Sequence, residues 1–294
     1  MGADTTTYLG RSPVSTGIAP TIELAHGALM PRLGLGTYPL KGDVAAATIA
    51  DALDAGYRLV DTAFAYGNED GVGRGIKASS VPREDVFVTT KFNRASHSVA
   101  GVHQAFADSA RILGVDYIDL MLIHWPNPSY GHYVDAWRGL AELLEAGDVR
   151  AIGLSNFKPA HIDRILAETG VVPDVNQIQL NPGVTRDGPR AYHAEHAEHG
   201  IVTESYSPLG PGSTLLREPV ITGIAERYGR TAGQIVLRWH MELGLVAIPK
   251  SGDPGRIRAN IDIFGFALTP DDVAAISALD KGEAAATDSD TTGH

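Results

Sequence analysis

Short apolar runs rich in β-branched residues recur along the chain. Eight of them begin near Leu33, Arg58, Val86, Ile118, Ala151, Asn176, Ile201 and Leu245. Several are almost continuously apolar, which is typical of parallel strands that are buried on both faces. Their starts lie 25 to 33 residues apart, except for a last gap of 44 residues. This spacing leaves room for a helix after each strand, and for one more helix in the last gap.

The segments between these runs carry apolar residues at helical spacing, and several end at glycine. The spacing predicts helices over 43–55, 133–146, 218–228, 231–243, 254–261 and 270–279. Strands that alternate with helices indicate right-handed crossovers and a parallel sheet. Eight such units at this spacing favour a closed (β/α)8 TIM barrel over an open sheet. We therefore expect a single α/β domain with two helices beyond those of the barrel.

The two ends of the chain differ from the barrel pattern. Short apolar segments flank the turn Ala25-His26-Gly27 and predict a β-hairpin that covers the bottom of the barrel. Residues 1–20 lack the basic start and apolar stretch of a secretory signal, so we expect a flexible leader. The domain then runs over 21–281. Residues 282–294 are small and polar, and we expect them to be disordered.

Composition narrows the classes of function. The formal net charge of −11 disfavours binding to nucleic acid or to an anionic membrane. The chain has no cysteine, which excludes thiolate chemistry and fits a reducing compartment, so we expect a cytoplasmic protein. No apolar run is long enough to span a membrane. His193, His196 and His199 drift around a helix rather than facing one ion. We expect a solvated helix there and no metal site.

Groups that can move protons gather at the carboxyl ends of successive predicted strands, where TIM barrels place their active sites. Asp61 ends the second strand and Tyr66 follows it, Lys91 ends the third strand, and His124 ends the fourth. Burying Lys91 requires a partner, and Asp61 is the available one. A neighbouring ammonium lowers the pKa of a tyrosine. This set suits protonation of an oxygen that gains negative charge, as a carbonyl oxygen does during hydride addition.

None of these four side chains can supply a hydride, so a cofactor is required. The residues at the remaining strand ends resemble a binding site for such a cofactor. They offer neutral amides and hydroxyls, one flat ring, and a cluster of cations at a helix start that suits a phosphate. These residues are Ser155, Asn156, Gln177, Tyr206, Lys250, Ser251 and Arg256. The chain has no G-x-G-x-x-G segment, so a nicotinamide nucleotide would bind without the Rossmann device.

Taken together, these residues make the chain resemble the aldo-keto reductase family from about residue 21 to 281, and most of all bacterial members of the 2,5-diketo-gluconate reductase type. The matching stretches are GLGTY at 34–38, DTAFAYGNEDGVG at 61–73, TTK at 89–91, IHWP at 123–126, GLSNF at 153–157, NQIQLNP at 176–182, SYSPLG at 205–210 and IPKS at 248–251. The resemblance implies a monomeric NADPH-dependent reductase of aldehydes or ketones, including dicarbonyls and keto sugars.

The resemblance also assigns roles by motif. Tyr66 would be the general acid, assisted by Lys91 and Asp61, and His124 would orient the carbonyl. The residues implied to bind the cofactor are Gly36, Thr37, Asp61, Ser155, Asn156, Gln177, Tyr206, Ser207, Leu209, Lys250, Ser251, Arg256 and Asn260. Tyr38 and Trp125 would line the substrate pocket. Asp253 departs from the family pattern because it would oppose a 2′-phosphate, but NADPH remains expected over NADH.

Two other functions stay open from the sequence. The cofactor bed alone would also serve a regulatory protein that binds NADPH with negligible turnover, and turnover separates the two. A barrel isomerase or aldolase could use Lys91 as a Schiff base. That reading leaves Ser155, Asn156, Gln177 and Lys250 without a purpose.

Overall fold

The computed structural model describes residues 19–185, 192–282 and 285–293, so most of the expected leader lies outside the described residues. The strands are β1 (Thr21–Glu23), β2 (Leu29–Pro31), β3 (Leu35–Gly36), β4 (Leu59–Asp61), β5 (Phe87–Phe92), β6 (Ile118–Ile123), β7 (Val149–Ser155), β8 (Val175–Gln179), β9 (Val202–Tyr206) and β10 (Val246–Ile248). The helices are α1 (Gly42–Asp54), α2 (Glu69–Ala78), α3 (Val99–Leu113), α4 (Tyr133–Ala146), α5 (Pro159–Thr169), α6 (Tyr192–Glu198), α7 (Pro219–Tyr228), α8 (Ala232–Glu242), α9 (Pro254–Ile261) and α10 (Pro270–Ser277).

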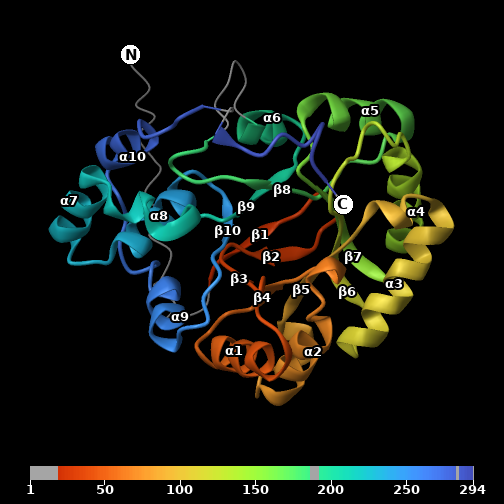
Figure 1. Cartoon of the computed structure of the whole chain (residues 1–294), viewed down its shortest axis with the longest axis horizontal. Coiled ribbons are helices and arrows are strands. Elements are labelled where there is room, and N and C mark those ends of the chain that lie inside the picture. Colours follow the sequence, from red (N-terminus) through yellow and green to blue (C-terminus); the bar gives the residue numbers. More distant parts are fainter. Residues whose placement is uncertain (1–18, 186–191, 283–284, 294) are drawn as a thin grey trace, which may run out of the picture.

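Strands β3 to β10 form a parallel sheet in sequence order, surrounded by helices (Figure 1). The first and last strands also meet: Gly34 N donates to Ala247 O at 2.9 Å, and Ala247 N donates to Arg32 O at 3.1 Å. These bonds close the sheet into a barrel. The predicted (β/α)8 fold is therefore confirmed, with α7 and α10 as the two additional helices. The predicted helix bounds agree with the structure to within two residues.

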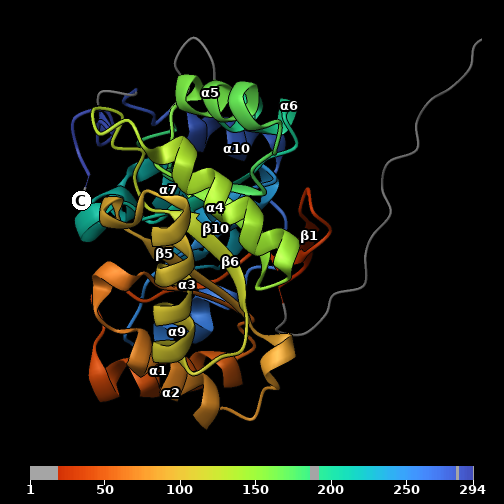
Figure 2. The ribbon, with the colours of Figure 1, turned by 90° about the vertical axis from the view of Figure 1, so that its right-hand side faces the viewer.

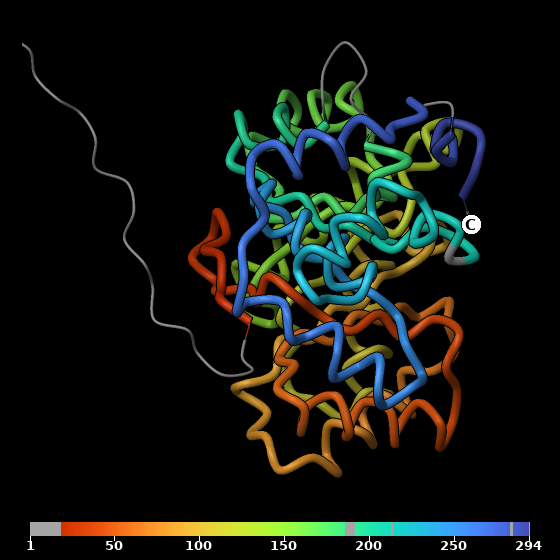
Figure 3. The backbone as a smooth tube through the Cα atoms, turned by 90° about the vertical axis from the view of Figure 1, so that its left-hand side faces the viewer, coloured from red at the N-terminus to blue at the C-terminus, as the bar shows by residue number. Residues whose placement is uncertain are grey.

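The N-terminal hairpin closes one end of the barrel. Strands β1 and β2 pair antiparallel, with Ile22 opposite Met30. Leu24 and Met30 are buried and join Leu59 and Leu120 in the cluster that fills the barrel interior. The hairpin and the C-terminal end of the described chain lie on opposite sides of the molecule (Figures 2 and 3). The mouth of the barrel opposite the hairpin thus remains available for a site.

Helix α6 is less solvated than its three histidines suggest. His196 is 1% exposed, accepts from Asn176 Nδ2 at 2.9 Å, and lies 2.8 Å from Thr203 Oγ1. His199 is exposed. The expectation of a fully solvated helix is wrong on this face because β8 and β9 supply polar partners that satisfy a buried imidazole. No group of three or more metal-binding side chains was found among the described residues.

The described part of the tail, 285–293, contacts the start of α5, and the disorder expected for 282–294 stays a prediction. Lys158 Nζ lies 2.6 Å from both Asp288 and Asp290, and His161 Nε2 lies 3.0 Å from Asp290. These partners stand at the start of α5, where a helix attracts anions. The acidic residues of the tail are evident in the sequence, but the cationic side chains that they contact could not be predicted from it.

Within the described residues, no helix is long and apolar enough to cross a membrane.

Candidate active site

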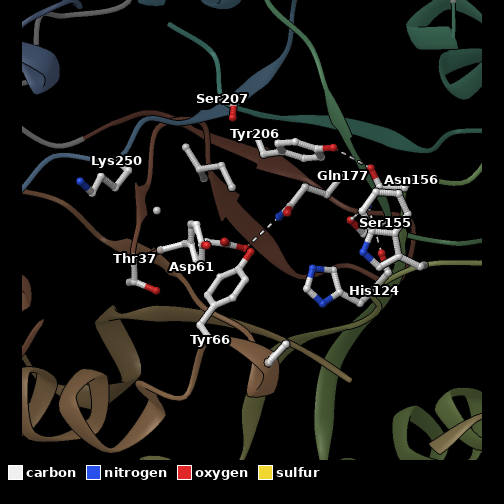
Figure 4. A pocket seen from close by; sticks show the side chains of 15 residues that line it. Thr37, Asp61, Tyr66, His124, Ser155, Asn156, Gln177, Tyr206, Ser207 and Lys250 are labelled. Carbon is white, nitrogen blue, oxygen red and sulfur yellow. Dashed lines mark hydrogen bonds between the residues drawn. The ribbon is translucent and has the colours of Figure 1, made fainter. Parts of the chain in front are cut away.

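The carboxyl ends of the barrel strands surround a cavity of about 640 Å3 (Figure 4). Every strand from β3 to β10 except β5 contributes a lining residue within two residues of its end, as expected for this fold. The cavity is lined by Gly36, Thr37, Tyr38, Asp61, Ala65, Tyr66, His124, Trp125, Ser155, Asn156, Gln177, Tyr206, Ser207, Ile248 and Lys250.

A buried ion pair forms the floor of this cavity. Lys91 Nζ donates to Asp61 Oδ1 and Oδ2 at 2.8 and 2.7 Å and to the carbonyl oxygen of Thr62 at 2.8 Å. Lys91 is 1% exposed, and Asp61 is 2% exposed. An ammonium has three hydrogens, and the Asp61 carboxylate, the Thr62 carbonyl and the nearby Tyr66 hydroxyl share them. The pair is therefore built to hold its charges in place, and the geometry does not favour Lys91 as a Schiff-base nucleophile.

Tyr66 stands above this pair, at the end of the short 3-10 helix Phe64–Tyr66. The Lys91 ammonium lies 5.1 Å from the centroid of its ring. Burial raises the pKa of the Tyr66 hydroxyl, and the charge of Lys91 lowers it by less than burial raises it. The expected lowering influence of Lys91 on the pKa of Tyr66 is therefore present, and burial, whose depth the sequence does not show, outweighs it.

Aromatic rings form the remaining wall beside Tyr66. The His124 imidazole meets the Tyr66 ring edge to face, with centroids 5.8 Å apart, and stacks on Trp125 at 6.3 Å. Tyr38 lies 5.1 Å from Tyr66 on the other side and is 62% exposed. Four aromatic side chains, Tyr38, Tyr66, His124 and Trp125, thus line one part of the cavity.

Amide and hydroxyl groups continue the lining of the cavity beside His124 (Figure 4). Tyr206 donates from its hydroxyl to Asn156 Oδ1 at 2.9 Å, which fixes its ring at the cavity wall (Figure 4). Asn156 Nδ2 in turn lies 3.1 Å from both His124 O and Ser155 Oγ. Gln177 donates to Asp61 Oδ2 at 2.8 Å. A flat ring beside several amide groups fits a nicotinamide with its carboxamide.

Backbone strain is concentrated at this mouth. Three non-glycine residues of the described chain have positive φ: Asn127 at 43°, Asn156 at 65° and Ser207 at 50°. Asn156 and Ser207 line the cavity, and Asn127 follows Trp125 by two residues. Such conformations cost about 1–3 kcal/mol and cluster at functional sites.

The expected phosphate-binding residues lie at the other end of the cavity, around the start of α9. Lys250 is exposed and lines the cavity, whereas Ser251 is buried beside it. Asp253 caps α9 by accepting from Arg256 N at 2.8 Å, and the Arg256 side chain is exposed. A lysine, a hydroxyl and an arginine at a helix N-terminus match the chemistry of a phosphate group. The set of groups thus fits NADPH at both ends.

Not every predicted site residue reaches the cavity itself. Among the described residues, Lys91, Leu209, Ser251, Arg256 and Asn260 lie outside its lining. Residues that the sequence reasoning missed are Ala65, Ile248 and, just behind the lining, Glu204. Ala65 and Ile248 carry no chemical signal. Glu204 did carry one: it is a charged residue within a predicted barrel strand, two positions before Tyr206.

Comparison with known proteins decides the family. A model of the aldo/keto reductase family matches residues 32–281. The chain belongs to the aldo/keto reductase family. It is 49% identical over 272 residues to 2,5-diketo-D-gluconic acid reductase B of Corynebacterium sp., covering 92% of this chain and 97% of that protein. It is 44% identical over 273 residues to methylglyoxal reductase DkgA of Escherichia coli, covering 92% and 98%.

A solved structure supports the same placement of this aldo/keto reductase. A variant of Gox0644 in complex with NADPH superposes with a TM-score of 0.88 at 41% identity, covering 94% of this chain and 99% of that one. The resemblance drawn from the sequence motifs is thereby confirmed for family and fold.

Proposed function

We propose that this aldo/keto reductase reduces aldehydes and ketones to alcohols with NADPH. The observation that carries the proposal is one cavity that joins a buried Asp61–Lys91 pair and an adjacent tyrosine to a wall of amides. NADPH-bound neighbours and reductase-named relatives support the same reaction class. A regulatory protein without turnover is not favoured, because a cofactor bed alone would not need the proton-transfer set.

Each side chain around the carbonyl has a distinct task. Bound NADPH supplies the hydrogen and electron pair that the carbonyl carbon accepts. Tyr66 gives its proton to the carbonyl oxygen, and the ammonium of Lys91 stabilises the phenolate that this leaves. Asp61 holds Lys91 in position and keeps it charged. His124, at the same depth, donates a hydrogen bond that orients the carbonyl toward Tyr66.

Cofactor binding divides along the cavity. Ser155, Asn156 and Gln177 would hold the carboxamide, and Tyr206 would stack on the nicotinamide ring. The expected contacts farther along the cofactor are Gly36, Thr37, Ser207 and Leu209 along its backbone, Lys250, Ser251 and Arg256 at the 2′-phosphate, and Asn260 at the adenine. Asp253 is occupied as a helix cap, which directs its carboxylate toward the Arg256 amide.

Substrates of this site are small carbonyl compounds. Tyr38 and Trp125 offer ring faces at the entrance. The names of the two relatives given above indicate dicarbonyls and keto sugar acids, and we propose dicarbonyls as the first class to test. We also propose that the enzyme works as a cytoplasmic monomer, which size-exclusion chromatography and cell fractionation check.

The deciding experiment follows absorbance at 340 nm while methylglyoxal, and then other aldehydes, are added to the protein with NADPH. Parallel reactions use NADH. Loss of absorbance with NADPH, abolished in Tyr66→Phe, establishes the reductase. Tight binding of NADPH with no turnover across the panel would instead support the regulatory alternative.

A further inference from the structure

Glu204 is an acid inside the barrel, directly behind the wall of the cavity. It lies on β9, with Gln177 of β8 on one side and Val246 of β10 on the other in the register of the sheet. Its side chain is fully buried, with 0% exposure. Isolated carboxylates are rarely buried so completely, because leaving water is costly for a charge. None of the roles proposed above uses this residue.

Gln177 connects Glu204 to the catalytic ion pair. Its Nε2 donates to Glu204 Oε2 at 2.7 Å and to Asp61 Oδ2 at 2.8 Å. An amide nitrogen carries two hydrogens, so these two acceptors use both of them. The amide oxygen of Gln177 is then left for a group in the cavity that this residue lines. Without Glu204 one amide hydrogen would lose its acceptor, and the plane of the amide would no longer be fixed from both sides.

The charges around Glu204 make its protonation state matter. Asp61 of β4 and Lys91 of β5 are the charged groups that act on it, Gln177 of β8 is neutral, and Val246 of β10 is apolar. Its second oxygen, Oε1, has no hydrogen-bond partner among the described residues. Burial and the Asp61 charge raise the pKa of Glu204 to about 8.

The sign of its influence on Tyr66 follows from these charges. When Glu204 is ionised, its negative charge raises the pKa of the Tyr66 hydroxyl. Tyr66 is then a weaker acid. When Glu204 is neutral, only the charges of Lys91 and Asp61 still act on the pKa of Tyr66.

We propose that Glu204 is a positioning residue of the reductase: it fixes the Gln177 amide at the cavity wall, and its protonation state sets how readily Tyr66 gives up its proton. This inference rests on the proposed carbonyl reduction. Reduction then slows as Glu204 loses its proton, in addition to any effect of the ionisation of Tyr66 itself.

Two substitutions separate the two parts of this role: the electrostatic half, which is the effect of the Glu204 charge on Tyr66, and the positioning half, which is the hydrogen bond that fixes Gln177. Glu204→Gln keeps an oxygen that can accept from Gln177 but cannot ionise. Glu204→Leu removes the acceptor as well. The matched control is Glu69→Gln, because Glu69 is also buried, its pKa is also raised by burial, and it accepts from Thr90 Oγ1 at 2.6 Å on the outer face of β5. For each variant we would measure kcat between roughly pH 6 and pH 9.5, and the Kd of NADPH by fluorescence quenching.

The wild type and Glu69→Gln should lose turnover above about pH 8, near the pKa of Glu204. Glu204→Gln should match the wild type within about twofold near pH 6 and exceed it severalfold near pH 9. Glu204→Leu should bind NADPH about tenfold more weakly at every pH, because a hydrogen bond that holds Gln177 is gone.

An unchanged alkaline limb in Glu204→Gln would overturn the electrostatic half of the proposal. NADPH affinity in Glu204→Leu equal to that of Glu204→Gln would overturn the positioning half. If Glu204→Leu does not fold, weaker NADPH binding in Glu204→Asp, whose shorter side chain draws the acceptor away from Gln177, decides that half. Absence of turnover in the wild type would contradict the proposed reduction. The comparison of NADPH affinity between Glu204→Leu and Glu204→Gln would still decide whether Glu204 positions Gln177.

Discussion

The barrel holds a buried carboxylate with cationic partners at each of its two ends, and the two clusters differ in the side chains that surround them. Near the hairpin, Asp119 accepts from Arg83 at 2.8 Å, from Arg150 at 3.0 Å and from Val88 N at 3.0 Å. Both guanidinium groups also lie about 4 Å from the Tyr117 ring centroid. Val88 lies on β5, Asp119 on β6 and Arg150 on β7, and Arg83 lies in the 3-10 helix Arg83–Asp85 before β5, so the cluster ties these three strands together.

At the other end the Asp61–Lys91 pair supports groups that face an open space. Tyr66 and His124 line the cavity of about 640 Å3, and Gln177 turns its amide toward the same space. Asp119 and Arg150 also border a cavity, of about 420 Å3, but no tyrosine or histidine lines it. The contrast teaches that burial, ion pairing and an adjacent cavity do not by themselves mark an active site; what marks it here is that Tyr66 and His124, which can transfer or direct a proton, line the cavity beside the ion pair.

The largest effect is expected for Tyr66→Phe. Removal of the acid should lower turnover by roughly 10²- to 10⁴-fold and leave NADPH binding and thermal stability unchanged. Steady-state kinetics at 340 nm, a binding titration and a melting curve measure the three quantities. The matched control is Tyr57→Phe, since the buried Tyr57 hydroxyl donates to Ile257 O at 3.1 Å far from the proton-transfer set. Equal loss of turnover in both variants would contradict the assignment.

Removal of one cation from each ion cluster should affect stability and turnover differently at the two ends of the barrel. Lys91→Met leaves Asp61 buried without its counter-ion, which should cost about 3–5 kcal/mol of stability and most of the turnover. Arg83→Met leaves Asp119 paired with Arg150, so we expect a loss of about 1–3 kcal/mol with kcat unchanged. Urea unfolding and kinetics on both proteins test this. A large fall in kcat for Arg83→Met would show that the barrel ends are coupled.

A smaller effect is expected at the end of the cavity where the 2′-phosphate of NADPH should bind. Lys250→Met should weaken NADPH binding about tenfold by removing a charge-assisted contact to the 2′-phosphate. NADH lacks that phosphate and should bind as before. Fluorescence titrations with both nucleotides give the ratio, and an equal loss for both would place Lys250 elsewhere on the cofactor.

The smallest effect concerns the tail. Hydrogen bonds and the charges of Asp288 and Asp290 outweigh partial burial and raise the pKa of Lys158 to about 12, and its contact lowers the pKa of Asp288. The contact should therefore persist at neutral pH and weaken on acidification, as Asp288 takes up a proton. Gly293 of the same tail lies beside Trp125, which lines the cavity. Lys158→Met, which removes an anchor of the tail, should therefore change KM for aldehydes by about two- to threefold with kcat unchanged, as expected for a partly exposed ion pair. An unchanged KM at every pH would show that the tail does not shape the entrance.

The sequence could predict what depends on local pattern. Periodicity and spacing were enough for the barrel, its hairpin and its extra helices, because each strand and helix carries its own signal. The same reasoning brought Asp61, Tyr66 and His124 to one place, since strand ends of a barrel share one face.

Other features depend on contacts between distant segments. The pKa of Tyr66 follows from the depth of its burial, which no local pattern encodes. The position of the tail depends on Lys158 and His161, more than 120 residues earlier in the chain. Glu204 is visible in the sequence as a charge within a predicted barrel strand, but its link to Asp61 runs through Gln177 and depends on the register of the barrel.

The positive φ angles of Asn156 and Ser207 have a consequence for anyone who wants a more heat-resistant biocatalyst. Glycine at either position would relax the backbone and is an obvious choice for consensus engineering. At position 156 it would also remove the amide that holds the Tyr206 hydroxyl. Robustness is therefore better sought at the hairpin end, where added stability does not compete with the shape of the cavity.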